Sequence, residues 1–272
     1  MTGILVVNAH LNGEKFDTLH KHLVECANRI GIMLKIKNNF EMPFCDEKAD
    51  FVLFWDKDVS LAKSLENKGF KVFNSASSIE LCDDKAKTYL ALEGRFKQPK
   101  TYIAPLSFFE CDYTDFVKSA AEKLGYPLVF KERFGSFGEQ VYLCENEAEV
   151  LSKISGKPFI LQQFISVSRG EDKRLEIVGD KCVAAMKRSN NSDFRSNITN
   201  GGTAEPYTPS DEEIALAVGA CKALGLTFGG VDILNGGYVC EVNSNAHIIN
   251  IMNATGIDVA PFIFDEIKRN LR

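Results

Sequence analysis

The residues best suited to do chemistry lie in the last quarter of the chain. Asp232 stands within the run GVDIL, Glu241 and Asn243 stand within YVCEVNSN, and an Asn-Gly-Gly turn signal at 235–237 predicts a β-hairpin. Because Glu241 and Asn243 are two residues apart, they face the same side of their strand, where Asp232 can reach them. Two carboxylates and an amide suit a magnesium ion that shares its other positions with phosphates. The alternative is a set of ordinary polar residues at a strand end.

A second candidate is a glycine-containing turn. Lys131 ends a predicted strand, and the run FGSFG follows it at 134–138. Backbone N–H groups in such a turn can approach an anion closely, and Lys131 would add a positive charge. The pattern fits both a phosphate-binding loop and an ordinary hairpin turn.

Two further segments could contact a nucleotide. The run ILQQFI at 160–165 can offer main-chain groups to a purine edge, although by itself it fits a buried core strand. The run DFRSN at 193–197 lies in an irregular segment just before a glycine pair at 201–202. Its Arg195 and Asn197 suit a centre where a phosphoryl group develops charge, with Lys187 and Arg188 extending the positive field. The alternative for this segment is a solvated loop.

The chain lacks a motif for a covalent nucleophile. It contains no GxSxG, no GxxxxGK[ST] loop, and no cysteine placed near a histidine in a known family pattern. The candidate residues are cations and metal ligands, which position and neutralise phosphoryl groups. We therefore expect phosphoryl positioning rather than covalent enzyme catalysis.

Composition narrows the class of protein. The 272 residues, 45% apolar and 25% charged, are enough for one large domain or two to three small ones. A net charge of −5 argues against a broad nucleic-acid surface, although a local basic groove is compatible with it. Eight scattered cysteines without a CxxC pair indicate reduced thiols in a cytoplasmic protein. No apolar run approaches the roughly 20 residues of a membrane span, so no membrane partner is expected.

Three groups of elements must position these residues. The first 75 or so residues alternate strands and helices, which predicts a small open parallel sheet: strands at 4–9, 34–37, 51–55 and 71–73, helices at 16–30 and 59–68. A linking helix at 77–92 leads to a second unit: strands at 101–104, 128–132, 141–144 and 159–164, helices at 115–124 and 145–154. The remainder holds strands at 173–178 and 181–188, an irregular segment at 189–209, the hairpin, and helices at 210–223 and 258–269.

Taken in order, these segments resemble the ATP-grasp superfamily, and most closely its RimK-like branch of amino-acid ligases. The resemblance runs from about Asn74 to Ala260, and its most specific elements are DFRSN with GG, GVDIL, EVN, and TGID at 255–258. It implies an α/β and α+β fold of three parts. These are a Rossmann-like N-terminal domain at 1–76, a linker helix and central lobe at 77–165, and a C-terminal lobe at 166–272, with the two lobes clasping ATP.

The resemblance also implies roles for particular residues. Lys85 and Lys131 correspond to the lysines that hold phosphates, and the main chain of Gln162, Gln163 and Phe164 corresponds to the adenine-binding hinge. The remaining correspondences are the glycine loop (Gly135, Ser136, Phe137, Gly138), the active-site pair Asp172 and Arg174, the residues facing the transferring phosphate (Arg195, Asn197), and the ligands of Mg²⁺ or Mn²⁺ (Asp232, Glu241, Asn243).

Several departures from the family pattern affect substrate recognition. Gln163 stands where glutamate is common, and Gln140 stands where a third glycine is usual. After Asn243 the chain reads Ser-Asn-Ala-His, where relatives often read Ala-Ser-Pro-Gly. Substrate identity therefore does not carry over, and His247 has either a substrate role or a role at a helix start.

The expected function is that of an ATP-dependent carboxylate–amine ligase. It would form an amide or peptide bond through an acyl phosphate, with a glutamate-like amino acid added to a small-molecule or peptide acceptor as the usual case in the family. Two alternatives stay open: a non-catalytic ATP-binding sensor or partner protein, and a synthetase that joins a carboxylate to a thiol. The sequence does not identify the acid, the amine, the number of additions or the oligomeric state.

Overall fold

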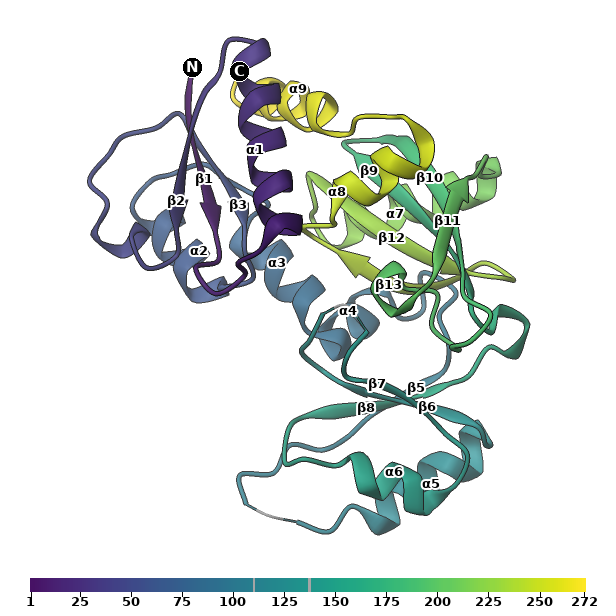
Figure 1. Ribbon diagram of the computed structural model, residues 1–272. Helices are drawn as coiled ribbons and strands as arrows, with labels where there is room; N and C mark the ends of the chain where they lie inside the picture. Colours follow the sequence, from purple (N-terminus) through teal and green to yellow (C-terminus); the bar gives the residue numbers. More distant parts are fainter. Residues whose placement is uncertain (110, 137) are drawn as a thin grey trace.

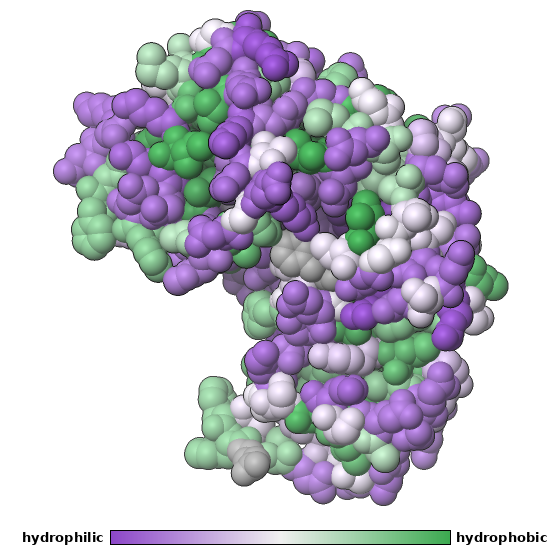
Figure 2. Space-filling model, viewed as in Figure 1, coloured by the Kyte–Doolittle hydropathy of each residue, from purple (hydrophilic) through white to green (hydrophobic). Residues whose placement is uncertain are grey.

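The computed structural model describes residues 1–109, 111–136 and 138–272, and its strands form three sheets. The N-terminal and C-terminal sheets lie side by side in one half of the molecule, whereas the central sheet forms a lobe that projects from them (Figure 1). Figure 2 shows a hollow in the surface between this lobe and the N-terminal half. The predicted combination of α/β and α+β parts is confirmed.

The N-terminal sheet consists of four parallel strands in the order β2-β1-β3-β4. Strand β3 is buried along its whole length, as expected for a parallel strand with both faces covered. Helix α1 covers one face with the buried stripe Leu19, Leu23 and Cys26. The elements are β1 (Thr2–Val7), α1 (Glu14–Arg29), β2 (Met33–Asn38), the short 3-10 helix η1 (Met42–Phe44), β3 (Phe51–Trp55), α2 (Val59–Asn67) and β4 (Val72–Phe73).

The prediction of one linking helix at 77–92 is wrong. Two helices, α3 (Ala76–Asp83) and α4 (Lys85–Leu92), meet at Asp84, whose backbone is extended. The Asp84 carboxylate accepts a hydrogen bond from the Ala86 N–H at 3.0 Å and so caps α4. Because the backbone of Asp84 is extended rather than helical, α3 ends before it. The Asp84 side chain then satisfies an N–H group in the first turn of α4 that has no partner within the helix.

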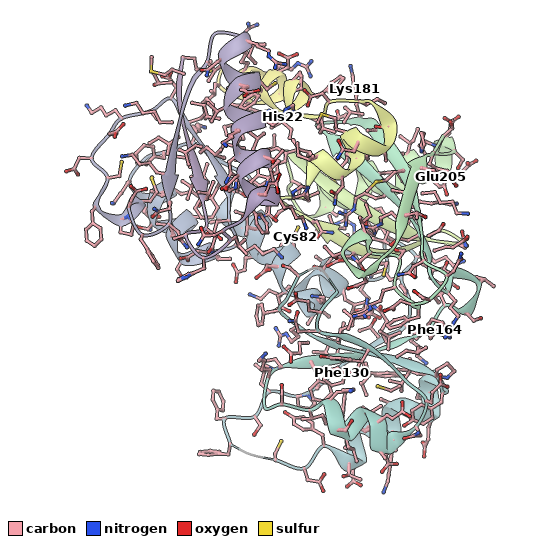
Figure 3. All side chains as sticks on the ribbon, viewed as in Figure 1. His22, Cys82, Phe130, Phe164, Lys181 and Glu205 are labelled. Carbon is pink, nitrogen blue, oxygen red and sulfur yellow. The ribbon has the colours of Figure 1, made fainter. Side chains whose placement is uncertain are left out.

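The central sheet is antiparallel, in the order β5-β8-β6-β7. Its core is aromatic: Phe130, which Figure 3 labels in this lobe, stacks on Phe159 with ring centroids 5.0 Å apart. Both rings belong to an apolar cluster that includes residues of the two helices of the lobe. The elements are β5 (Thr101–Ile103), α5 (Thr114–Leu124), β6 (Leu128–Glu132), β7 (Val141–Cys144), α6 (Glu147–Lys153) and β8 (Phe159–Gln163).

The C-terminal sheet has five antiparallel strands in the order β11-β10-β9-β12-β13. Helix α7 packs on one face, and α8 packs on the other. The elements are the 3-10 helix η2 (Ser166–Ser168), β9 (Glu171–Val178), β10 (Lys181–Ser189), the 3-10 helix η3 (Ile198–Asn200), β11 (Thr203–Pro206), α7 (Asp211–Ala223), β12 (Phe228–Leu234), β13 (Tyr238–Asn243), α8 (Ile248–Thr255) and α9 (Ala260–Asn270).

One strand, one α-helix and the two 3-10 helices of this lobe were not predicted. Strand β11 lies inside the segment expected to be irregular, and it is a four-residue edge strand that ends in proline. Helix α8 has eight residues, IINIMNAT, a length at which an apolar run does not show a helical period clearly. The other predicted elements are present, with bounds that differ by a few residues.

The first and last parts of the chain share one core. A single apolar cluster contains buried residues of the N-terminal sheet, α1, α8 and α9, and Trp55 stacks on Phe228 at 5.7 Å with an interplanar angle of 13°. His22 on α1 contacts the Asp258 carboxylate at 2.8 Å, just before α9 (Figure 3). This core contains residues from both 1–76 and 166–272, so it does not mark where one predicted domain ends and another begins. The three predicted domain ranges therefore stay predictions.

Two expectations about the environment can be compared with the fold. The eight cysteines, all within the described residues, are free thiols, as predicted. Over residues 1–109, 111–136 and 138–272, no helix is both long and apolar enough to cross a bilayer.

Asn74 joins the two halves of this core, and replacing it with alanine should destabilise the protein. Its side chain accepts hydrogen bonds from Thr227 N (2.8 Å) and Phe228 N (3.3 Å), and donates to Phe228 O (2.9 Å) and Ser244 O (2.7 Å). Asn74→Ala leaves buried backbone groups unpaired, so the free energy of unfolding in urea should fall by roughly 2–4 kcal/mol.

The matched control is Asn28→Ala, at an exposed position near the end of α1. It should change the free energy of unfolding by no more than about 0.5 kcal/mol. Equal values for the two variants would show that Asn74 does not hold the halves together.

Candidate active site

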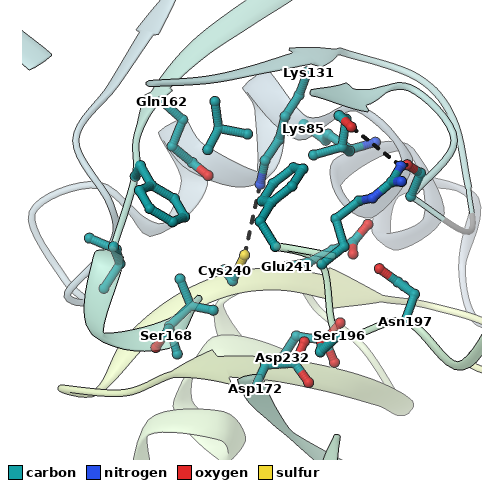
Figure 4. A pocket seen from close by; sticks show the side chains of 18 of the residues that line it. Lys85, Lys131, Gln162, Ser168, Asp172, Ser196, Asn197, Asp232, Cys240 and Glu241 are labelled. Atoms are coloured by element: carbon teal, nitrogen blue, oxygen red, sulfur yellow. Dashed lines mark hydrogen bonds between the residues drawn. The ribbon is translucent and has the colours of Figure 1, made fainter. Parts of the chain in front are cut away.

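A cavity of about 110 Å³ lies between the central and C-terminal sheets, and it collects most of the predicted site residues. Figure 4 shows Lys85, Lys131 and Gln162 on one side of it and Asp172, Asp232 and Glu241 on the other. Thirteen of the sixteen predicted residues line it: Lys85, Lys131, Gly135, Ser136, Gly138, Gln162, Gln163, Phe164, Asp172, Arg195, Asn197, Asp232 and Glu241. Phe137 lies outside the described residues.

Lys85 is positioned by the break between α3 and α4. The Arg133 guanidinium binds both carboxylate oxygens of Asp84, with its Nε at 2.9 Å, and the Lys85 N–H donates to the Arg133 carbonyl at 3.0 Å. The start of α4 is thereby tied to the end of β6, and the Lys85 ammonium donates to the Gly135 carbonyl at 3.3 Å. Burial lowers the pKa of Lys85, and the charge of Lys131 lowers it further.

Lys131 reaches across the cavity from the central sheet. Only 8% of its surface is exposed, and its Nζ lies 3.8 Å from the Cys240 sulfur. The pairing of β12 with β13 shifts register between Asp232 and Ile233, and this bulge places Cys240 next to Glu241 on the cavity side. The two buried ammonium groups make the cavity a favourable place for phosphate.

The glycine loop adopts backbone conformations that suit glycine. Gly135 and Gly138 have φ of 140° and 73°, in the region that L-residues rarely adopt. A Cβ at Gly138 would lie 2.9 Å from Asn197 Oδ1, and one at Gly135 would overlap the Gln140 side chain. The loop therefore packs closely against the opposite lobe, and Gln140 occupies the space beside it.

The expected adenine-binding hinge lies where β8 leaves its sheet. The ladder ends at Gln163, and Phe164 then packs edge to face on Phe194 with centroids 6.3 Å apart. The Gln162 amide donates to Thr101 Oγ1 at 2.9 Å, which fixes its orientation. Gln162, Gln163 and Phe164 at the end of this strand line the cavity between the lobes.

Strand register aligns the charged residues of the C-terminal sheet. Arg174 on β9 pairs with Asp232 on β12, which in turn pairs with Glu241 on β13, so all three share one face. Arg174 binds Asp232 through two hydrogen bonds of 2.7 Å, and Arg188 binds Asp172 through two of 2.7 and 2.6 Å. Arg188 also lies 2.9 Å from Asp232. The result is a buried network of two arginines and two aspartates.

This network controls the charge of Asp232. Burial by itself raises the pKa of the carboxyl, but the coulombic and hydrogen-bonding effects of Arg174 and Arg188 outweigh it and hold the pKa below its usual range. Asp232 is thus an ionised carboxylate at neutral pH. The pairing of Arg188 with Asp172 and Asp232 was not part of the predicted site. Arg188 lies on β10, two strands away from Asp232 on β12, and the available signal was its place on the strand that follows Arg174 in the sequence.

Arg195 contacts the glycine loop. Its Nη1 donates to the Gly138 carbonyl, while Nε and Nη2 donate to the Asp193 carboxylate at 3.0 and 2.7 Å. The hydrogen bonds to Asp193 raise the pKa of Arg195, so the guanidinium stays charged. The DFRSN segment therefore covers the loop from the side of the C-terminal lobe.

The donor set at the hairpin fits a magnesium ion bound together with phosphates. Asp232 and Glu241 are direct partners across β12 and β13, and Asn243 follows two residues later on the same face. The Asn243 amide nitrogen is buried and has no hydrogen-bond partner. Within 1–109, 111–136 and 138–272, no group of three or more His, Cys, Asp or Glu side chains is placed to hold a metal ion.

A second cavity of about 460 Å³ adjoins the first, and the two share Glu241, Asn197 and Arg188. Arg174 and Asn243, the two predicted residues missing from the first cavity, line this one. Its other wall comes from the N-terminal sheet and α1: Asn8, Lys15, His20, Asp56 and Lys57. These lining residues were not predicted from the sequence. The available signal was the presence of polar residues directly after two buried parallel strands.

His247 faces the second cavity and does not cap a helix. It occupies the position before α8, but its side chain makes no capping hydrogen bond. The ring Nε2 lies 3.3 Å from the Lys15 carbonyl, and Nδ1 is buried without a partner. Burial lowers the pKa of His247 to about 4, so the ring is neutral at pH 7.

This arrangement of two lobes around lysines, a glycine loop and an acidic hairpin defines an ATP-grasp protein. The same fold occurs in D-alanine–D-alanine ligase from Bacillus anthracis, solved in complex with ATP. The TM-score is 0.76, with 16% identity over 100% of this chain and 96% of that chain.

Residues 82–267 match the RimK-like ATP-grasp domain, and the chain belongs to this family. It is 35% identical over 220 residues to an uncharacterised protein of Mycoplasma pneumoniae, and the aligned residues cover 76% of this chain and 75% of the relative. It is also 35% identical over 223 residues to a probable alpha-L-glutamate ligase of Vibrio parahaemolyticus, over 78% and 72% of the two chains. The predicted family and the general class, an ATP-dependent C–N ligase, are confirmed.

The buried His247 should make stability depend on pH. Its pKa is about 4 in the folded protein and 6.5 in the unfolded chain, so only the unfolded state gains a proton between these values. As pH falls from 6.5 to 4, the free energy of unfolding should drop by up to about 3 kcal/mol from this group. His247→Gln should lose that part of the pH dependence in urea unfolding at pH 7 and pH 4.5.

The control is His10→Gln, at an exposed position, which should keep the pH profile of the unchanged protein. Parallel pH profiles for His247→Gln and the unchanged protein would contradict the assignment.

Proposed function

We propose that the protein joins a carboxylate to an amine, with an acyl phosphate as the intermediate and ADP and phosphate as the other products. The observation that carries this proposal is the convergence of Lys85 and Lys131 from one side and Asp232 and Glu241 from the other on one cavity. Cations that hold phosphates and carboxylates that hold a metal are the groups phosphoryl transfer requires.

ATP is the proposed nucleotide. Lys85 and Lys131 would hold its phosphates, the glycine loop would cover them, and the main chain at Gln162, Gln163 and Phe164 would bind adenine. Asp232, Glu241 and Asn243 would hold Mg²⁺, with Mn²⁺ as an alternative ion; when bound, the metal neutralises phosphate charge. Asp172 and Arg174 keep Asp232 and Arg188 in place through the buried network.

The bond changes follow from this placement. A substrate carboxylate oxygen attacks the γ-phosphorus, and the bond to the ADP oxygen breaks. The amine nitrogen then attacks the acyl carbon, loses a proton, and phosphate leaves. Arg195 and Asn197, both at the cavity, would stabilise the negative charge on the phosphoryl and tetrahedral oxygens.

We propose two substrates. One is an amino acid, and the other is a small molecule or peptide that supplies the amine or the carboxylate. The similarity to a probable alpha-L-glutamate ligase supports a glutamate-like amino acid. A cytoplasmic location, with its supply of ATP, is part of the same proposal.

One observation favours a second candidate, a non-catalytic ATP sensor. Asp232 is bound by two arginines and Arg195 by Asp193, so each of these residues already has a partner. In a sensor these pairs would persist when ATP binds. In the ligase, contacts with the metal and the phosphates would replace these pairs.

A screen for ADP release separates the two candidates. The purified protein is incubated with Mg-ATP and pairs of amino acids and short peptides, and products are identified by mass spectrometry. ADP release with a matching amide product supports the ligase. Binding of ATP without ADP release from any pair supports the sensor.

Replacing Arg195 with alanine should reduce turnover without preventing ATP binding. Losing one preorganised donor to a developing oxyanion typically costs about 100- to 1000-fold in kcat, and we expect Arg195→Ala to fall in this range. The Kd for ATP should stay within about threefold, because the lysines and the hinge remain. Arg29→Ala, at an exposed position on α1, is the control and should turn over normally. Normal turnover of Arg195→Ala would remove Arg195 from the mechanism.

A further inference from the structure

Several residues that line the second cavity carry a buried polar atom that has no hydrogen-bond partner in the protein. In the part of the chain that the structure describes, four side chains with such atoms line this cavity: Asp56 Oδ2, Gln140 Oε1, Asn243 Nδ2 and His247 Nδ1. Buried polar atoms are normally hydrogen-bonded, and leaving one unpaired costs free energy. Several such atoms around one cavity indicate a surface built to bind a polar ligand.

Asp56 is the charged member of this set. It follows β3 at the carboxyl end of the N-terminal sheet, and only 4% of its surface is exposed. Its Oδ1 accepts hydrogen bonds from Asn8 Nδ2 at 2.9 Å and from Lys57 N at 2.7 Å. One carboxylate oxygen thus fixes the side chain, and the other is left for a ligand. A buried carboxylate with one unused oxygen favours a cationic hydrogen-bond donor.

The other unpaired atoms include two further acceptors. The Lys15 carbonyl beside His247 Nε2 can only accept, so Nε2 carries the proton of the neutral ring and Nδ1 is an acceptor. Gln140 Oε1 is also an acceptor. Asp56, His247 and Gln140 therefore offer acceptors to one cavity, and an ammonium group has three N–H donors.

Donors come from a different part of the cavity wall. The Asn243 amide nitrogen lies on the C-terminal sheet, where the Arg174 guanidinium also lines the cavity. A ligand with a cationic group toward Asp56 and a carboxylate toward the C-terminal sheet matches both ends. The end of the second cavity at the C-terminal sheet adjoins the first cavity, because Glu241 and Asn197 line both cavities.

We infer that the second cavity binds a free amino acid and that Asp56 recognises its unblocked ammonium group. This inference rests on the proposed function and specifies the class of one substrate: a zwitterion rather than an N-acylated residue of a peptide. Asn8 and Asp56 lie outside residues 82–267, which match the family domain. The charged partner of the ammonium group thus comes from the N-terminal part of the chain, whereas Gln140 and His247 lie within the matched domain.

The experiment compares free amino acids with their N-acetyl forms. A panel of L- and D-amino acids is tested singly by thermal shift with Mg-ATP present, and in pairs by ADP release. At least one free amino acid should raise the melting temperature, and its N-acetyl form should bind at least about 100-fold more weakly, the effect of losing an ion-paired hydrogen-bond donor in a buried site. Equal binding of the two forms, or no binding by any free amino acid, overturns the inference.

The variant Asp56→Asn isolates the charge. Asparagine retains Oδ1, which makes the contacts with Asn8 and Lys57, and replaces only the unpaired oxygen. The KM for the amino acid should rise about 10- to 100-fold while the KM for ATP stays unchanged. Binding of the 2-hydroxy acid analogue, which lacks the ammonium group, should be the same in Asp56→Asn and in the unchanged protein.

The matched control is Asp46→Asn, an exposed position of the same N-terminal part, which should leave both KM values unchanged. An unchanged KM for the amino acid in Asp56→Asn overturns the inference while the ligase activity stands. Amino-acid binding without ADP release from any pair overturns the proposed function while the inference stands. If Asp56→Asn does not fold, the comparison of free and N-acetyl forms on the unchanged protein decides the matter.

Discussion

The pairing of Arg174, Asp232 and Glu241 across three neighbouring strands is the constraint on which the candidate site depends. Buried charges are costly unless they are paired, and Arg188 and Asp172 complete a network in which each carboxylate has a guanidinium partner. Such networks contribute little net stability, but they fix orientation, because breaking one pair leaves an uncompensated charge. A one-residue slip of β12 would turn Asp232 to the opposite face and remove it from the first cavity.

The two cavities lie at two different interfaces between sheets, and they suit two different kinds of ligand. The interface of the central and C-terminal sheets holds the lysines, the glycine loop and the hinge, all of which suit a nucleotide. The interface of the N-terminal and C-terminal sheets holds a larger cavity with unpaired acceptors and donors, which suits a small polar molecule. Glu241 and Asn197 line both cavities, so a phosphoryl group bound in the first, as proposed, would lie next to a ligand bound in the second.

The sequence revealed the parts of this arrangement that depend on local patterns. Short apolar runs predicted the strands, and the turn signal at 235–237 predicted that Asp232 lies on the strand paired with that of Glu241, as it does. Features that depend on distant partners could not be predicted. The contact that ties Asp84 to β6 depends on Arg133, which lies 49 residues later, and the bulge that turns Cys240 inward requires the pairing of two strands. Asn8 and Asp56 are ordinary polar residues until the parallel sheet brings the ends of β1 and β3 together.

The shared core has a consequence for synthesis on the ribosome. Helix α1 is among the first elements made, yet its buried face packs in a cluster that includes α9, the last helix of the chain. The central lobe, by contrast, closes its own aromatic core from residues 104–161. During synthesis, the central lobe can therefore close its core before the C-terminal partner of α1 has been made. Removal of α9 would leave the buried face of α1 without part of its packing.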